Sequence, residues 1–147
     1  MLILLCIWLI CIIASDWRHR RVPNVLVLTG AALALLALMT GLQPFALTWS
    51  SALMAAGIGF AAMLIFYALG LMGAADVKFV AALGLWLGSW SLLWVWIGAS
   101  LLAALHSLVL IAWRGRTQLP RLRRREIPYA AHLAAVTIGW LIWQNHA

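Results

Sequence analysis

Two aspartates are the residues of this chain best suited to chemistry. Asp16 directly follows the apolar run 1–15, and Asp76 lies in the segment 73–78 between two long apolar runs. The whole chain has only three acidic residues. Because a carboxylate inside a bilayer costs on the order of 2.5 to 3.5 kcal/mol, an acid kept beside such runs is a candidate functional group. The structural alternative is that Asp76 caps the following helix and pairs with Lys78.

Two carboxylates in a partly dry site can carry out acid and base chemistry together. The ionised carboxylate activates a water molecule, and the protonated carboxyl group donates its proton to a substrate carbonyl. Like charges held close together separate the two affinities for a proton, which favours this division of roles. The pattern therefore points to hydrolysis, provided that the fold brings Asp16 and Asp76 together.

The helices that would position Asp16 and Asp76 belong to a membrane protein. The chain is 67% hydrophobic and 9% charged, and its mean hydropathy is +1.06. Soluble domains are roughly half apolar and a quarter charged. We therefore predict an all-α, polytopic integral membrane protein. Its net charge of +7 is expected to act on topology and on anionic lipid headgroups, and we expect no nucleic-acid partner.

Six apolar runs are expected to form transmembrane helices, of which the first and the fourth are short. We find no soluble domain, so residues 1–147 are predicted to form a single membrane domain. The first run has no basic residue before it, which favours a retained helix over a cleaved signal peptide. The six expected helices cover residues 1–15, 25–41, 51–72, 77–90, 91–113 and 128–143.

The basic residues predict the orientation of these helices. All ten Lys and Arg residues fall in the connections after the first, third and fifth expected helices or, for Lys78, directly beside one of them. By the positive-inside rule these connections are cytoplasmic, so both termini lie outside. Asp16, Asp76 and Glu126 are then all on the cytoplasmic side.

Helix length predicts that the two aspartates lie at the same depth. Asp16 follows a run of about 15 residues and Asp76 precedes one of about 14, so each helix rises only about 21 to 23 Å. The hydrocarbon core is about 30 Å thick. If both helices start at the outer interface, both aspartates lie slightly inside the cytoplasmic surface.

Three motifs resemble those of the bacterial type IV prepilin peptidases, which are membrane aspartic proteases of the GxGD type. The short form is most similar to the peptidases of tight-adherence (Flp) pilus systems. The resemblance implies that Asp16 and Asp76 are catalytic. It implies that the substrates are prepilins or pseudopilins, whose short basic leader is removed at the cytoplasmic face of the bacterial inner membrane. The motifs are Asp16-Trp17-Arg18 with Val22-Pro23-Asn24, Gly73-Ala74-Ala75-Asp76-Val77-Lys78, and Ile127-Pro128-Tyr129.

The same motifs name residues that are expected to shape the site or bind substrate. The second glycine of GxGD is Ala75 here, and its Cβ disfavours positive φ, so we expect an ordinary backbone path to Asp76. The cytoplasmic domain with paired cysteines that larger family members use for methylation is missing, so methylation is not expected. No cofactor and no metal are expected. The site-shaping candidates are Gly73, Ala75, Lys78, Pro128 and Tyr129.

The other ionisable groups have simpler interpretations. His106 and His132 lie within apolar runs and are expected to form hydrogen bonds between helices. A proton relay or a metal site is the alternative, but no HExxH pattern supports a metal. Glu126 lies beside Arg124 and Arg125 and is expected to form a surface ion pair.

Two other classes of function stay open from sequence. A small transporter would use the same aspartates to bind a cation or relay protons, although it would favour acids near the midplane and broken helices in matching halves. A scaffold without catalysis would leave the placement of both acids unexplained. Among proteases, a signal-peptide-peptidase relative is disfavoured because Ser15 rather than tyrosine precedes Asp16. The oligomeric state and the pilin that is cut are not predicted.

Overall fold

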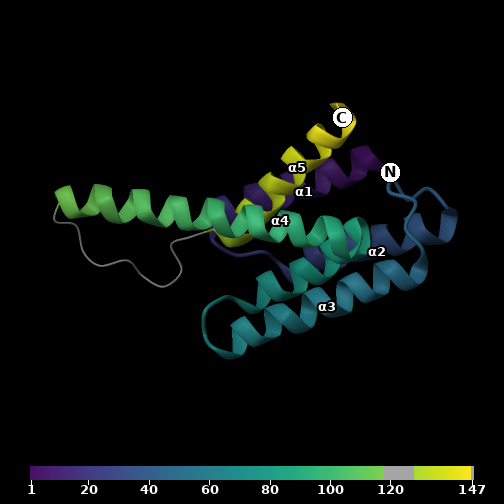
Figure 1. The fold of residues 1–147 in the computed structure, drawn as a ribbon, viewed down its shortest axis with the longest axis horizontal. Coiled ribbons are helices and arrows are strands. Elements are labelled where there is room, and N and C mark those ends of the chain that lie inside the picture. The colour runs from purple at the N-terminus through teal and green to yellow at the C-terminus, as the bar shows by residue number, and fades with distance from the viewer. Residues whose placement is uncertain (118–127, 147) are drawn as a thin grey trace.

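The computed structural model describes residues 1–117 and 128–146, and all regular elements in these two ranges are α-helices (Figure 1). The all-α class is therefore confirmed. The described residues form five helices, not the six expected. The helices are α1 (Leu2–His19), α2 (Asn24–Thr40), α3 (Trp49–Ala68), α4 (Ala74–Thr117) and α5 (Tyr129–His146).

The difference in helix number arises at Gly88. The fourth and fifth expected helices are continuous in α4, and Gly88 interrupts it with φ 72° and ψ 173°. This conformation is essentially restricted to glycine. The residues on both sides are helical, so the two expected helices share the label α4 and meet at Gly88. In Figure 1 the chain reverses direction within α4, between its teal half and its green half.

Helix α1 ends later than expected. It continues past Ser15 to His19, so Asp16 lies in its last turn rather than in a connection. The helix ends because Arg20 adopts a left-handed conformation (φ 53°), and the Arg20 N–H donates to the Asp16 carbonyl at 2.9 Å. The Ser15 hydroxyl also donates to the Arg21 carbonyl at 2.9 Å. With 18 residues, α1 rises about 27 Å, so the expectation of a short first helix is wrong.

A tight turn joins α3 to α4. Gly70 has φ 70°, its N–H donates to the Tyr67 carbonyl, and the Leu71 N–H donates to the Phe66 carbonyl, both at 2.9 Å. This pair of bonds is the Schellman motif, in which a glycine in the left-handed region ends a helix. The turn leads into α4 within a few residues, which places Asp76 near the end of α3.

Buried indole groups connect α2 to its neighbours. The Trp8 ring of α1 donates to the Leu26 carbonyl at 2.8 Å, and the Trp86 ring of α4 donates to the Gly30 carbonyl at 3.0 Å. The Trp86 carbonyl in turn accepts from the Gln43 side chain at 2.8 Å. These bonds satisfy polar groups of the core while the rings fill it.

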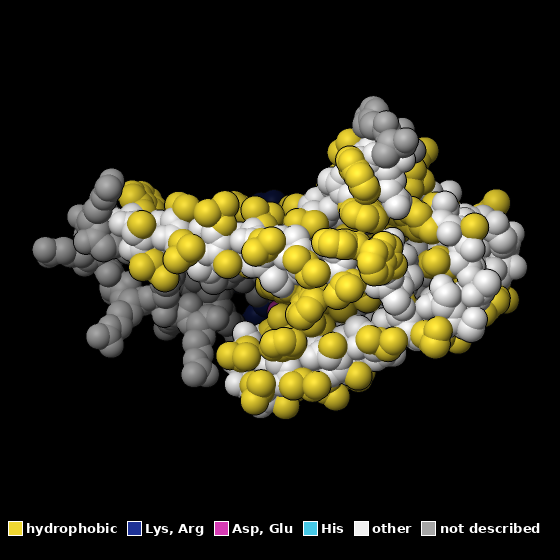
Figure 2. Space-filling model, viewed as in Figure 1, with side chains coloured by type: hydrophobic (Ala, Val, Ile, Leu, Met, Phe, Trp, Pro, Cys, Tyr) yellow, Lys and Arg dark blue, Asp and Glu magenta, His cyan; other side chains and the backbone are white. Residues whose placement is uncertain are grey.

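The outer surface is that of a membrane protein. Among the described residues, α1, α3 and α4 are long and apolar enough to cross a membrane, and α2 is a shorter apolar helix. Figure 2 shows hydrophobic side chains distributed along α4 and over α3, with few charged side chains visible on the described surface. Exposed apolar surface of this extent is stable only against lipid or another apolar partner. We therefore treat the chain as an integral membrane protein.

Candidate active site

Asp16 and Asp76 line one cavity. Its volume is about 700 Å³. The last turn of α1, the connection 70–73 and the first turn of α4 form its wall. Single residues of α3, of the second half of α4 and of α5 close it, namely Tyr67, Ala103 and Tyr129. The two carboxyl groups are close enough to interact electrostatically.

The first turn of α5 holds the Asp16 carboxyl group. Asp16 is only 7% exposed, and its Oδ2 accepts the backbone N–H of Ala131 at 2.9 Å. Ala131 is the third residue of α5, where backbone N–H groups have no partner within the helix. Pro128, which precedes α5, has no side-chain acceptor. Asp16 therefore caps α5 from another helix, and this contact fixes the direction of its carboxyl group.

The start of α4 holds the Asp76 carboxyl group in a similar way. Asp76 is half-buried, and its Oδ2 accepts the N–H of Gly73 at 3.2 Å while the Asp76 N–H donates to the Gly73 carbonyl at 3.1 Å. An acid in the third helical position that bonds back to the N-cap N–H is half of a capping box. The capping interpretation of Asp76 is thus confirmed alongside its place in the cavity.

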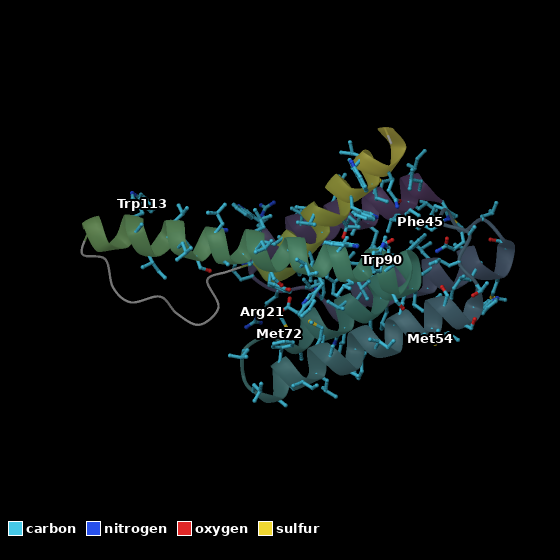
Figure 3. All side chains as sticks on the ribbon, in the orientation of Figure 1. Arg21, Phe45, Met54, Met72, Trp90 and Trp113 are labelled. Carbon is cyan, nitrogen blue, oxygen red and sulfur yellow. The ribbon has the colours of Figure 1, made fainter. Side chains whose placement is uncertain are left out.

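Basic side chains lie beside the aspartates. Arg20 and Arg21 line the same cavity, and the charge of Arg20 acts on Asp16. In Figure 2 charged side chains are visible inside the hollow between α3 and the second half of α4. Figure 3 shows Arg21 and Met72, both of which line the cavity, near one another. The cavity therefore combines both signs of charge with apolar wall residues.

Three of the five site-shaping candidates contribute to this cavity. Gly73, Ala75 and Tyr129 line it. Ala75 is helical, so the expected ordinary backbone path to Asp76 is confirmed. A Cβ added at Gly73 would lie 3.3 Å from Asp76 Oδ2, so this glycine leaves room for the carboxyl group. The Tyr129 hydroxyl is 3.0 Å from the Ser100 hydroxyl of α4.

The other two candidates lie elsewhere. The ammonium group of Lys78 donates to Asn24 Oδ1 of α2 at 3.1 Å. Lys78 and Asn24 lie at a second, smaller hollow between α2, α3 and α4. The structural alternative included a pairing of Lys78 with Asp76, but the hydrogen bond of Lys78 goes to α2 instead. Pro128 contributes its carbonyl oxygen, which accepts the side-chain N–H of His132 at 2.6 Å.

The two histidines lie close to Asp16. His106 Nδ1 and His132 Nε2 are 3.0 Å apart and join α4 to α5, so the expected hydrogen bond between helices is confirmed. His132 directly follows Ala131, whose N–H donates to Asp16. Glu126 and its expected ion pair with Arg124 and Arg125 lie outside the described residues.

Some contributors to the site were not predicted from sequence. Arg20 was considered only for topology, and Tyr67 and Ala103 were considered only as parts of apolar runs. The backbone N–H of Ala131 has no side-chain signal at all. Its contact spans 115 positions of the chain, and only the sequence motif at Pro128 and Tyr129 pointed to this region.

Comparison with known proteins identifies a peptidase family. A family model described as the type IV leader peptidase family matches residues 3–108, a stretch that contains both aspartates. No curated protein and no solved structure gave a match. The family match covers more than half of the chain and ends before Pro128. The protein is therefore a peptidase that belongs to the type IV leader peptidase family.

Proposed function

We propose that this chain is a membrane aspartic endopeptidase that removes the short basic leader of Flp-type prepilins or pseudopilins. One observation carries the proposal: Asp16 and Asp76, far apart in the sequence, line one cavity in a chain of the leader peptidase family. The transporter and scaffold alternatives are set aside because the chain belongs to a peptidase family.

The reaction would need no group beyond the two carboxyls and water. The ionised carboxylate takes a proton from water as the water oxygen attacks the scissile carbonyl carbon. The protonated carboxyl group gives its proton to the carbonyl oxygen, which yields a neutral tetrahedral diol. The diol then collapses: its C–N bond breaks as the nitrogen takes the proton that the first carboxyl group had gained from water, and the second carboxylate takes a hydroxyl proton from the diol, which leaves the amine and the carboxylic acid as products. Each aspartate acts once as an acid and once as a base over the cycle.

The hydrogen bonds of the site suit this chemistry. In each aspartate one oxygen, Oδ2, is held by a backbone N–H, from Ala131 for Asp16 and from Gly73 for Asp76. We expect each carboxyl group, held in this way, to present an oxygen to water and the scissile carbonyl. Because backbone donors hold both side chains, neither carboxyl group has to reorganise when the charge develops.

The cavity wall also suits an extended substrate. Gly73 and Ala75 have small side chains beside Asp76, so a substrate backbone can approach the carboxyl group closely. We place this end of the bundle at the cytoplasmic face of the bacterial inner membrane, because the basic residues near α1 and α4 favour that side. A leader that precedes an apolar helix would enter the cavity from the cytoplasm while its helix stays in the bilayer.

Co-expression with a candidate Flp-type prepilin tests the proposal. We expect the wild-type chain to remove the leader, as seen by a mobility shift and by mass spectrometry of the new N-terminus. Asp76→Asn should remove none, although it inserts in the membrane at the same level. Glu126→Gln, which makes the same acid-to-amide change at the third acid, should cleave nearly normally. Substantial cleavage by the Asp76→Asn variant would contradict the mechanism.

A further inference from the structure

Two histidines form a hydrogen-bonded pair next to the proposed catalytic site. His132 of α5 is buried, with 6% of its surface exposed. Its Nε2 lies 3.0 Å from His106 Nδ1 of α4, and its Nδ1 lies 2.6 Å from the Pro128 carbonyl oxygen. The rings of the two histidines meet edge-on, with centroids 5.0 Å apart. The reaction proposed above uses neither side chain.

The partners determine the direction of the hydrogen bonds. A carbonyl oxygen only accepts, so His132 Nδ1 carries the proton and donates to Pro128. In the neutral ring His132 Nε2 is then the acceptor, and His106 Nδ1 donates to it. The two bonds therefore form a chain that runs from α4 to the start of α5.

This chain ends on the turn that holds Asp16. The Pro128 carbonyl also accepts the backbone N–H of His132 at 3.2 Å, which is the first helical bond of α5. Ala131 lies within that turn and donates its N–H to Asp16. The ring of His132 thus reinforces the same carbonyl that starts the helix, and any shift of this turn moves the donor to Asp16.

The pair also contacts α1. The ring centroid of His106 lies 6.4 Å from that of Trp17, the residue after Asp16. The histidines therefore touch all three elements that surround the Asp16 carboxyl group: the last turn of α1, the second half of α4 and the first turn of α5.

We propose that His106 and His132 are positioning residues for Asp16, which hold the first turn of α5 so that its N–H aims the carboxyl group into the cavity. This role rests on the proposed function for its effect on catalysis. The geometric part of the role does not depend on catalysis, and it can be measured separately.

Four variants separate this role from a general effect on α5. His132→Asn retains an N–H donor near the position of Nδ1, so it keeps the bond to Pro128. His132→Gln places its amide near Nε2 and loses that bond. His106→Leu removes the donor to His132 Nε2 and leaves the bond from His132 to Pro128 in place. Thr137→Val is the matched control, because Thr137 is also buried in α5 and its hydroxyl donates to the carbonyl four residues before it, that of Leu133, at 2.7 Å.

Hydrogen–deuterium exchange of the detergent-solubilised protein gives the first readout. In His132→Gln, amides in the first turn of α5 should exchange about two- to tenfold faster, the range expected for losing one buried hydrogen bond. His106→Leu should show a smaller increase, and His132→Asn and Thr137→Val should stay near wild type. An unchanged rate in His132→Gln, or an equal increase in Thr137→Val, overturns the proposal.

Leader cleavage gives the second readout. In His132→Gln, kcat should fall roughly tenfold or more with KM within about twofold, because small misplacements of a catalytic group act on the chemical step. His132→Asn should restore most of kcat. Equal activity of the two variants overturns the positioning role. If wild type itself fails to cleave any prepilin, the proposed function fails, and the exchange rates still decide the geometric role.

Discussion

Asp16 is predicted to have two separable roles, one in chemistry and one in stability. Its buried carboxyl group lines the cavity with Asp76, and the same group accepts the Ala131 N–H at 2.9 Å. Asparagine retains an oxygen that can accept this N–H, but it cannot exchange a proton with water. Alanine loses both properties. Comparing Asp16→Asn with Asp16→Ala therefore isolates the hydrogen bond to α5 while both variants lack the titrating group.

The structure gives an expected size for each effect. Loss of a general acid or base lowers the rate by about 10² to 10⁴, so both variants should be nearly inactive. Removing an N-cap acceptor costs about 0.5 to 2 kcal/mol. Asp16→Ala should therefore have a lower free energy of unfolding than Asp16→Asn by this amount. The upper half of the range is expected, because the N–H of Ala131 is buried and water does not replace the lost acceptor.

The same comparison at Asp76 serves as a control. Asp76 is half-buried and its bond from Gly73 is longer, at 3.2 Å, in an exposed part of the site. Water can replace this acceptor, so Asp76→Ala and Asp76→Asn should differ in stability by less than the Asp16 pair does. Both Asp76 variants should still lose cleavage.

Purified protein in detergent allows both measurements on one sample. Leader removal is scored by mass spectrometry of a prepilin peptide, and stability by reversible denaturant unfolding. Cleavage by Asp16→Asn within tenfold of wild type would refute the catalytic role. Equal stability of the Asn and Ala variants at position 16 would refute the capping role.

Three further predictions follow from the fold and the proposed site. Cleavage in liposomes should have a bell-shaped pH profile, because the pair must hold one proton, and a profile that is flat from mildly acidic to strongly alkaline pH would contradict the dyad. Gly84→Ala should lower the free energy of unfolding by about 1 to 3 kcal/mol, since its Cβ would lie 2.8 Å from the α3 backbone at Ala55 and Ala56. Gly57→Ala, whose Cβ would meet nothing within 4 Å, is the control, and equal losses in detergent unfolding would show that the α3–α4 contact is not the cause. Reporter fusions between α1 and α2 should report the cytoplasm and those between α2 and α3 the outside, and the reverse pattern would contradict the proposed orientation.

Local sequence signals located most of the elements correctly. The start of α2 after Pro23 and its end before Gly41 both follow from backbone preferences of single residues. The division of the apolar stretch 77–113 into two helices at residues 90 and 91 lies close to the observed break at Gly88, and the chain is helical on both sides of it. Apolar length alone could not tell a helix interrupted by one glycine from two separate helices, because both have the same hydrophobic pattern.

The end of α1 shows where local signals fail. The first charged residue, Asp16, was expected to end the helix, but the helix continues until Arg20 adopts the left-handed conformation. A buried acid in the last turn is stable here because a donor from another helix satisfies it. Charge alone predicts exposure, and only a partner distant in sequence can reverse that prediction.

The sequence by itself determined the membrane class and the aspartates that carry the proposed chemistry. Composition determined the membrane class, because apolar surface of this extent needs lipid. The resemblance to a known family and the scarcity of acids identified the aspartates. Only the tertiary structure decided how the acids are held. In the structure the Asp16 carboxyl group accepts the N–H of Ala131, Lys78 donates to Asn24, and Arg20 lines the cavity. These contacts depend on how the helices cross, and the backbone N–H that holds Asp16 is chemically the same at nearly every residue. No side-chain pattern can therefore reveal which N–H it is, and packing alone selects it.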